Sequence, residues 1–358
     1  MIYREAGQFK TSYAADHAIF PILQDRFFII AVLLVAYLVV PFVASPYFLV
    51  TIMIPSLIFC IAALGLNVLT GYAGQLSLGT GGFMAVGAYA TFKMTTMFPE
   101  LNIVVVFLLS GLFAAAVGVV FGIPSLRIKG FYLAVATLAA QFFLVWLFNR
   151  VAWFSNYDPS GTISMPPRDF LGISVAGSGA TPAARYVVVL TLVLVFSLMV
   201  KNLVRSRMGR MWMAVRDMDI AAEIMGIRLM WAKLSAFAFS SYLCGVAGAL
   251  YFALYLRTVE TIAFDIVLSF LVLFMIIVGG LGSVLGSILG AFFIISIPIL
   301  LTRVPDAFGI PISVDLAKHL EAIIFGGLII FFLIVEPHGL ARLWQIAKEK
   351  LRRWPFPY

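Results

Sequence analysis

The feature that most constrains this chain is a series of apolar runs, each about 20 residues long, separated by short polar or glycine-rich segments. A helix of that length crosses the hydrocarbon core of a bilayer, because each residue rises by about 1.5 Å. Hydrophobic residues make up 63% of the 358 residues and charged residues only 11%, too few for the polar helix faces that a soluble protein needs. The sequence therefore predicts an all-α, polytopic membrane protein.

We expect about ten transmembrane or re-entrant helices, some of them broken by glycine near a pathway. The expected spans are Phe27–Ala44, Tyr47–Leu69, Gly81–Phe98, Ile103–Gly122, Phe131–Asn149, Arg185–Val204, Met230–Leu256, Phe264–Gly280, Val284–Thr302 and His319–Val335. The chain then divides into an N-terminal segment (1–26), a membrane domain (27–336) and a basic tail (337–358), with an external loop at 150–184 and a charged loop at 205–228.

The distribution of charge orients the spans. Ten crossings put both termini on one side, and placing that side in the cytoplasm puts most of the 24 basic residues inside, including those of the 205–228 loop and the tail. This bias explains the net charge of +8 without a nucleic-acid partner, because the basic residues form no continuous stripe. We expect both termini to be cytoplasmic and the tail to lie on the anionic surface of the lipid bilayer.

A glycine-rich segment, GLNVLTGYAGQLSLGTGG, joins the second and third spans at Gly65–Gly82. Irregular backbone at membrane depth is tolerated where protein or a water-filled cavity surrounds it, and transporters often bind substrate at broken helices. The candidate pathway residues are Asn67, Gly71, Gln75, Ser77 and Gly79. A glycine-mediated helix contact or a tight cytoplasmic turn explains the same pattern.

The charged loop contains a second candidate site. The segment Asp219–Met225 favours a short helix, with Asp219 as its cap and Gly226 as its stop. Ile220, Ile224 and Ile227 share one side and could pack into a groove on a partner. An ordinary amphipathic loop helix with solvated charges fits the spacing equally.

Three further features complete the candidates. Gly279, Gly280, Gly282 and Gly286 favour helix packing and a tight turn between the eighth and ninth spans. Gln141, within the fifth span, favours either an interhelical hydrogen bond or a pathway contact. Asp158, Arg168 and Asp169 in the external loop are solvated or form a charged rim for a substrate-delivering protein.

The sequence contains no pattern of catalytic residues. No GxxxxGK[ST] or GxSxG motif is present, Cys60 and Cys244 fall inside apolar spans, and the three histidines are far apart. We therefore expect no catalytic residue, no metal site and no ATPase site in this chain.

Four segments, in order, resemble the branched-chain amino acid ABC transporter permeases, specifically the LivM-type subunit: GLNVLTGYAGQLSLG, the turn and helix of Gly122–Gln141, Met208–Ala249, and GGLGSVLGSILG. The resemblance implies a permease in a bacterial inner membrane, paired with a second related permease, two cytoplasmic ATPase subunits that bind the ATP, and a periplasmic protein that delivers leucine, isoleucine or valine. No cofactor is implied in this chain itself. The resemblance also implies that the charged loop carries the cytoplasmic coupling helix, and its contact residues here would be Ala214, Arg216, Asp219, Ala221, Ala222, Glu223 and Gly226.

Other functions remain open from the sequence. The family often carries His or Gln with Ala where this chain has Thr80, Gly81 and Gly82, which keeps urea, short amides or another amino acid as alternative substrates. An ion-coupled carrier acting alone would need acidic residues along its spans, and few spans hold any. A structural scaffold would not explain the glycine-broken spans.

Overall fold

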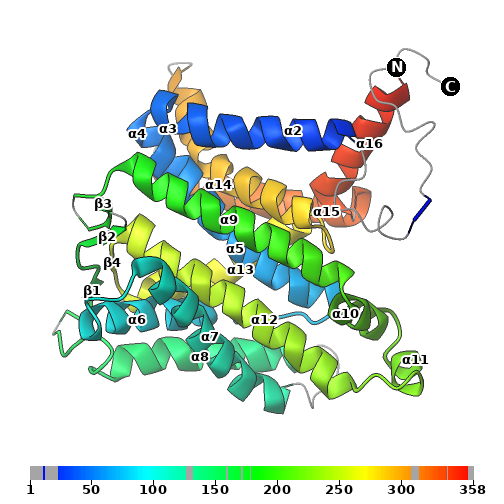
Figure 1. Cartoon of the computed structure of the whole chain (residues 1–358), viewed down its shortest axis with the longest axis horizontal. Coiled ribbons are helices and arrows are strands. Elements are labelled where there is room, and N and C mark those ends of the chain that lie inside the picture. Colours follow the sequence, from blue (N-terminus) through cyan, green and yellow to red (C-terminus); the bar gives the residue numbers. More distant parts are fainter. Residues whose placement is uncertain are drawn as a thin grey trace.

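The computed structural model describes residues 11–12, 23–125, 132–158, 160–170, 172–177, 179–307, 314–336 and 338–353. Long helices lie side by side across the molecule, and two small β-ribbons lie at one end (Figure 1). In one ribbon β1 (Ile163–Ser164) pairs antiparallel with β4 (Thr258–Val259), and in the other β2 (Arg168–Phe170) pairs antiparallel with β3 (Ile173–Ala176). The prediction of an all-α membrane protein is confirmed, because the ribbons are confined to connections between helices.

The first crossing is a peripheral helix. It consists of α2 (Leu23–Leu34), the π-helical turn η1 (Val35–Val39) and α3 (Val40–Val43). No residue from 25 to 43 is buried. The hydroxyl groups of Tyr37 and Thr191 are 2.9 Å apart, and this contact ties the crossing to a neighbouring helix.

The core is built on two long crossings. One runs through α4 (Pro46–Phe48), η2 (Leu49–Met53), α5 (Ile54–Asn67) and η3 (Val68–Tyr72), and every residue of α5 is buried. The other is α12 (Leu229–Leu250), which continues into η4 (Tyr251–Leu256). Burial on all sides explains why these segments are apolar all round rather than amphipathic.

Glycine lets two more helices lie directly on α12. They are α6 (Thr80–Met97) and α7 (Ile103–Ser125). A Cβ atom placed on Gly87 of α6 would lie 1.9 Å from the Gly245 carbonyl oxygen, so α6 and α12 touch through their backbones. Close backbone contact of this kind is how helices pack in a membrane, where no hydrophobic effect drives them together.

The remaining helices surround this core. They are α8 (Tyr132–Arg150), α9 (Pro182–Arg205), α10 (Arg207–Asp217), α11 (Asp219–Ile224), η5 (Thr261–Phe264), α13 (Ile266–Gly279), α14 (Val284–Ala307), α15 (Val314–Val335) and α16 (Gly339–Arg353). Among the described residues, eight helices are long and apolar enough to cross a membrane. The two other expected spans correspond to α6 and α15, so the observed helices follow the expected boundaries closely.

The two ends of the molecule differ. Figure 1 shows α10, α11, α16 and the beginning of α2 at one end and the β-ribbons at the other. The described beginning and end of the chain therefore lie at the same end, as an even number of crossings requires. Residues 1–10, 13–22 and 354–358 of the two terminal segments, and the basic turn at 126–131, fall outside the described residues.

Candidate functional site

The glycine-rich segment contains a non-helical stretch that connects one long crossing to α6; this stretch and the helix ends beside it are called the broken crossing below. The helix that begins at Pro46 ends at Tyr72, residues 73–79 are not helical, and α6 begins at Thr80. Within the break, Gln75, Ser77 and Gly79 are buried, whereas Gly74 and Leu76 are exposed. This alternation is the pattern of an extended strand with one face toward the protein.

Side chains of α8 and α13 satisfy the backbone at the start of α6. The Gly82 N–H donates to Gln141 Oε1, and Gln141 Nε2 donates to the Phe264 carbonyl oxygen at 2.7 Å. The Gly81 N–H donates to Ser269 Oγ at 2.8 Å. Gln141 thus forms the interhelical hydrogen bonds that its position in an apolar span suggested, and these bonds let a helix start inside the membrane domain.

The predicted pathway residues differ in whether their polar side-chain atoms already form hydrogen bonds within the protein. Asn67 Nδ2 donates to the Ser283 carbonyl at 2.9 Å and to Ser287 Oγ at 2.7 Å, and Asn67 Oδ1 accepts from the Gly282 N–H at 2.8 Å. Asn67 therefore holds the turn between α13 and α14 against the end of α5. All three of these hydrogen bonds serve packing.

Gln75 stands apart from Asn67. Its side chain is 4% exposed, and neither of its polar atoms has a hydrogen-bond partner among the described residues. Ser77 Oγ, in contrast, accepts from the Gly79 N–H at 3.3 Å. A buried, unpaired amide is costly, so Gln75 is the pathway candidate with spare capacity to bind something polar.

The second glycine-rich segment packs as closely as its composition suggested. A Cβ atom on Gly279 would lie 2.1 Å from the Gly286 carbonyl oxygen, which places the backbones of α13 and α14 in contact. Gly280 and Gly282 have φ angles of 120° and 73°, so the turn between the helices needs glycine at both positions. Gly71 fits against this turn, where an added Cβ would meet the Gly282 nitrogen at 2.3 Å.

The charged loop forms two helices where the sequence predicted one. The helix α10 was missed, and it buries Trp212, whose Nε1 donates to Ser235 Oγ at 3.0 Å. Ser206 caps this helix, since its Oγ accepts from the Met208 N–H. Two features of the sequence could have predicted α10: Ser206 as its cap, and Gly209, Trp212 and Val215 at every third position, which are the residues it buries. The many charged residues between them hid this pattern.

The predicted short helix exists as α11, and it ends before Gly226, which has a φ of 88°. The proposed Asp219 cap is wrong: Met218 occupies the cap position and no side chain caps the helix. Ile220 and Ile224 are 73% and 82% exposed, whereas Ile227 is half-buried. The apolar knob therefore consists of Ile220 and Ile224, and Met218 and Met225 beside them are also exposed.

The other residues assigned to the coupling contact lie in different environments. Glu223 and Gly226 are exposed, Ala214, Asp219 and Ala221 are half-buried, and Ala222 is fully buried. Arg216 points inward: its Nη1 donates to the Gly71 carbonyl oxygen at 2.7 Å, while its Nη2 lies 2.8 Å from Asp217 Oδ1. This guanidinium joins the charged loop to the glycine-broken crossing, a contact between residues 145 positions apart that sequence spacing could not reveal.

Two charged residues of the external loop serve its own structure. Arg168 donates to the carbonyl oxygens of Pro99 and Thr95 and so holds the β2–β3 ribbon against the end of α6. Ser160 donates to Asp158 through both its hydroxyl and its N–H, and these hydrogen bonds lower the pKa of that carboxyl. Arg168 is therefore not a solvated rim charge, and Asp169 pairs with Ser174 of β3.

The histidine, cysteine and acidic side chains that could hold a metal ion do not cluster in the described part of the chain. Among the residues that the structure describes, no group of three or more His, Cys, Asp or Glu side chains could hold a metal ion. Cys60 and Cys244 are both free and buried.

The bundle of apolar helices, the non-helical segment at residues 73–79 and the exposed loop helix define a multi-pass membrane protein of the transporter class. Residues 48–333 match the family described as "Branched-chain amino acid transport system / permease component", and the chain belongs to that family.

Two curated relatives extend this result. The chain is 30% identical over 345 residues to the "High-affinity branched-chain amino acid transport system permease protein LivM" of Escherichia coli, covering 89% of this chain and 75% of the relative. It is 26% identical over 280 residues to the "Probable branched-chain amino acid transport permease protein LivM" of Methanocaldococcus jannaschii, covering 74% and 78%. No solved structure matches the chain significantly.

Proposed function

We propose that this chain is the permease subunit of an ATP-driven ABC importer that carries leucine, isoleucine and valine. The observation that carries the proposal is membership of the permease family over residues 48–333, together with relatives named for branched-chain amino acid transport. The chain would form the translocation pathway with a second related permease. Two ATPase subunits would bind the ATP, and a periplasmic protein would deliver the substrate, so this chain needs neither cofactor nor ATPase site.

We place the protein in a bacterial inner membrane with both termini in the cytoplasm. Basic residues support this orientation, because they concentrate in α10 and α16 at one end of the helices. The same end presents the α11 knob of Ile220 and Ile224 to water, where two exposed isoleucines on a short helix are costly without a partner. A groove on the ATPase is the partner we assign to this knob.

Substrate would pass along the broken crossing at residues 73–79. The unpaired Gln75 amide offers both a donor and an acceptor, and the start of α6 directs the positive end of a helix dipole to the same region. A zwitterion with an apolar side chain matches a path that has few fixed charges and an exposed Leu76. Because the Gln75 amide is closed off in this conformation, the path must open before substrate reaches it.

Movement of the ATPases would reach that path through contacts within this chain. The knob on α11 lies next to α10, and Arg216 at the end of α10 holds Gly71 at the start of the break. Displacing α11 therefore displaces the C-terminal end of η3 and residues 73–79, which follow it. Alternating access results if this displacement opens the segment toward one side of the membrane and then the other.

A purification experiment tests the assignment of the knob. We expect the ATPase and second permease to co-purify with the gently solubilised wild-type chain, and Ile224→Asp to lose the ATPase, because it places a charge in an apolar groove. The matched control is Glu349→Asp on α16, an exposed position at the same end of the molecule. Retention of the ATPase by Ile224→Asp would show that α11 does not form the contact.

A further inference from the structure

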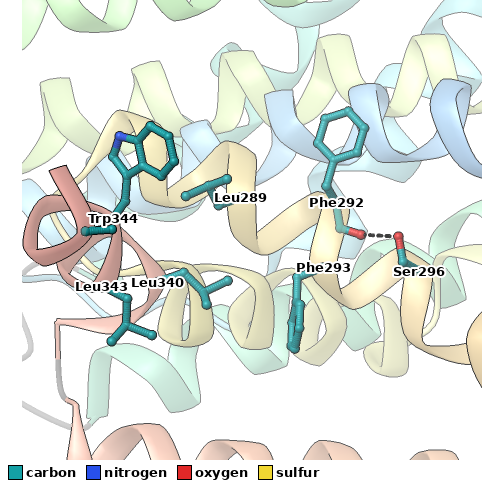
Figure 2. Close-up of a pocket in the computed structure, with 8 residues that line it drawn as sticks. Leu289, Phe292, Phe293, Ser296, Leu340, Leu343 and Trp344 are labelled. Atoms are coloured by element: carbon teal, nitrogen blue, oxygen red, sulfur yellow. Dashed lines mark hydrogen bonds between the residues drawn. The ribbon is translucent and has the colours of Figure 1, made fainter. Parts of the chain in front are cut away.

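An apolar groove lies between α14 and α16, and none of the functional features described above uses it. Its volume is about 530 Å³. Figure 2 shows Phe292, Phe293 and Trp344 around it, and the lining residues are Leu289, Phe292, Phe293, Ser296, Leu340, Leu343, Trp344 and Ala347. Ser296 Oγ donates to the Phe292 carbonyl oxygen of its own helix at 2.7 Å, so the one hydroxyl of the lining needs no ligand. The groove suits a hydrocarbon occupant.

The groove extends along α14 away from α16. On α14 the lining extends from Leu289 to Ser296, about 10 Å along a helix that begins at Val284 near α16. On the other side, α16 lies at the α10–α11 end of the molecule, across the ends of the spans (Figure 1). An occupant can therefore have an apolar part along α14 and a polar part beside α16.

The sequence of α16 places a lysine on each edge of the groove. Leu340, Leu343, Trp344 and Ala347 form one stripe at helical spacing. Lys348 and Lys350 flank this stripe, but Lys348 is paired with Asp25, so the net positive charge at the edge of the groove comes from Lys350. A groove with an apolar floor and this lysine at its edge is complementary to an anionic amphiphile.

Two contacts hold α16, and with it the edge of the groove, against α2. Lys348 Nζ lies 2.7 Å from Asp25 Oδ2 of α2, and the Trp344 ring lies 6.3 Å from the Phe28 ring. These contacts join α16 to the first crossing, which has no buried residue from 25 to 43 and many exposed ones.

We propose that this groove binds one anionic phospholipid, with an acyl chain along α14 beneath Trp344 and the phosphate beside Lys350. The apolar lining suits the acyl chain, and the lysine at the edge of the groove suits the phosphate.

The fluorescence of Trp344 supplies a direct test. The purified assembly is reconstituted in nanodiscs that contain brominated phosphatidylglycerol or brominated phosphatidylcholine, and the Trp344 signal is the difference between the wild type and Trp344→Phe. We expect phosphatidylglycerol to quench this signal at lower mole fractions than phosphatidylcholine does. Ala347→Phe, which fills the groove, should weaken quenching by both lipids.

A charge substitution tests the headgroup contact. Lys350→Gln should reduce the preference for phosphatidylglycerol about 5-fold, the factor that corresponds to one surface lysine. Arg207→Gln, which removes an exposed charge from α10 at the same end of the molecule, should leave the preference unchanged.

Two results would overturn the proposal. Equal quenching by the two lipids would show that the groove does not select an anionic headgroup. An intact assembly whose Trp344 signal is not quenched by either lipid would mean that protein covers the groove. Neither result depends on which substrate the protein carries.

Discussion

Replacing Arg216 should uncouple ATP hydrolysis from transport. The side chain is 39% exposed and makes one hydrogen bond across the structure, from Nη1 to the Gly71 carbonyl oxygen at 2.7 Å. A hydrogen bond from a charged donor contributes about 1.5–3 kcal/mol, and partial exposure to water reduces this to about 1–1.5 kcal/mol. Arg216→Met keeps the aliphatic stem but loses this contact, which corresponds to about a 10-fold change in an equilibrium that depends on it.

The expected result follows from where Arg216 lies. The knob of α11 remains intact in Arg216→Met, so the ATPases should still assemble and hydrolyse ATP. Leucine carried per ATP hydrolysed should fall about 10-fold in proteoliposomes, because α10 no longer holds the broken crossing. Arg216→Lys should restore part of the ratio, since a single ammonium can reach the Gly71 carbonyl but cannot also hold Asp217 as the guanidinium fork does.

Arg210 provides the matched control. It lies on the same helix, and its Nη1 donates at 2.8 Å to the Arg205 carbonyl oxygen, a local contact outside the broken crossing. Arg210→Met should leave the amount of leucine carried per ATP unchanged. An unchanged ratio in Arg216→Met, or an equal loss in both variants, would refute the idea that Arg216 transmits the movement.

Two further predictions concern the helix contacts. Gly87→Leu should prevent accumulation of folded protein, because its Cβ would lie 1.9 Å from the Gly245 carbonyl oxygen. The control Gly326→Leu should be tolerated, since no atom lies within 4 Å of its Cβ position. The measurement is the yield of detergent-stable protein by size-exclusion chromatography. Gln141→Leu should lower the midpoint of thermal unfolding by several degrees, because the Gly82 N–H loses its acceptor at a cost of about 1–3 kcal/mol, and an unchanged midpoint would contradict this role.

Apolar run length and glycine position predicted much of the fold, because both act locally. The expected span Ile103–Gly122 corresponds to α7 (Ile103–Ser125), and the expected stop at Gly226 matches its φ of 88°. The stop was predictable because only glycine adopts that angle at no steric cost. Helix α10, which the sequence analysis missed, shows the limit: its Trp212 is buried and donates to Ser235 of α12, a contact that residue spacing within the loop does not show.

The candidate site was less predictable for the same reason. Asn67 and Gln75 are both polar residues in the same glycine-rich segment, and their types alone do not separate a packing role from a pathway role. Asn67 uses its amide on Gly282, Ser283 and Ser287, whereas Gln75 keeps its amide unpaired. The difference is that the turn at residues 282–287, more than 200 positions away, forms hydrogen bonds with Asn67 but not with Gln75.

The central claim is that this chain carries branched-chain amino acids with energy from partner ATPases. The most direct test is uptake of radiolabelled leucine into proteoliposomes that contain the co-purified assembly, the binding protein and internal ATP. We predict uptake that requires ATP and that unlabelled isoleucine and valine suppress, while urea and acetamide do not. Uptake that proceeds without ATP, or competition by urea or acetamide in place of isoleucine and valine, would contradict the claim.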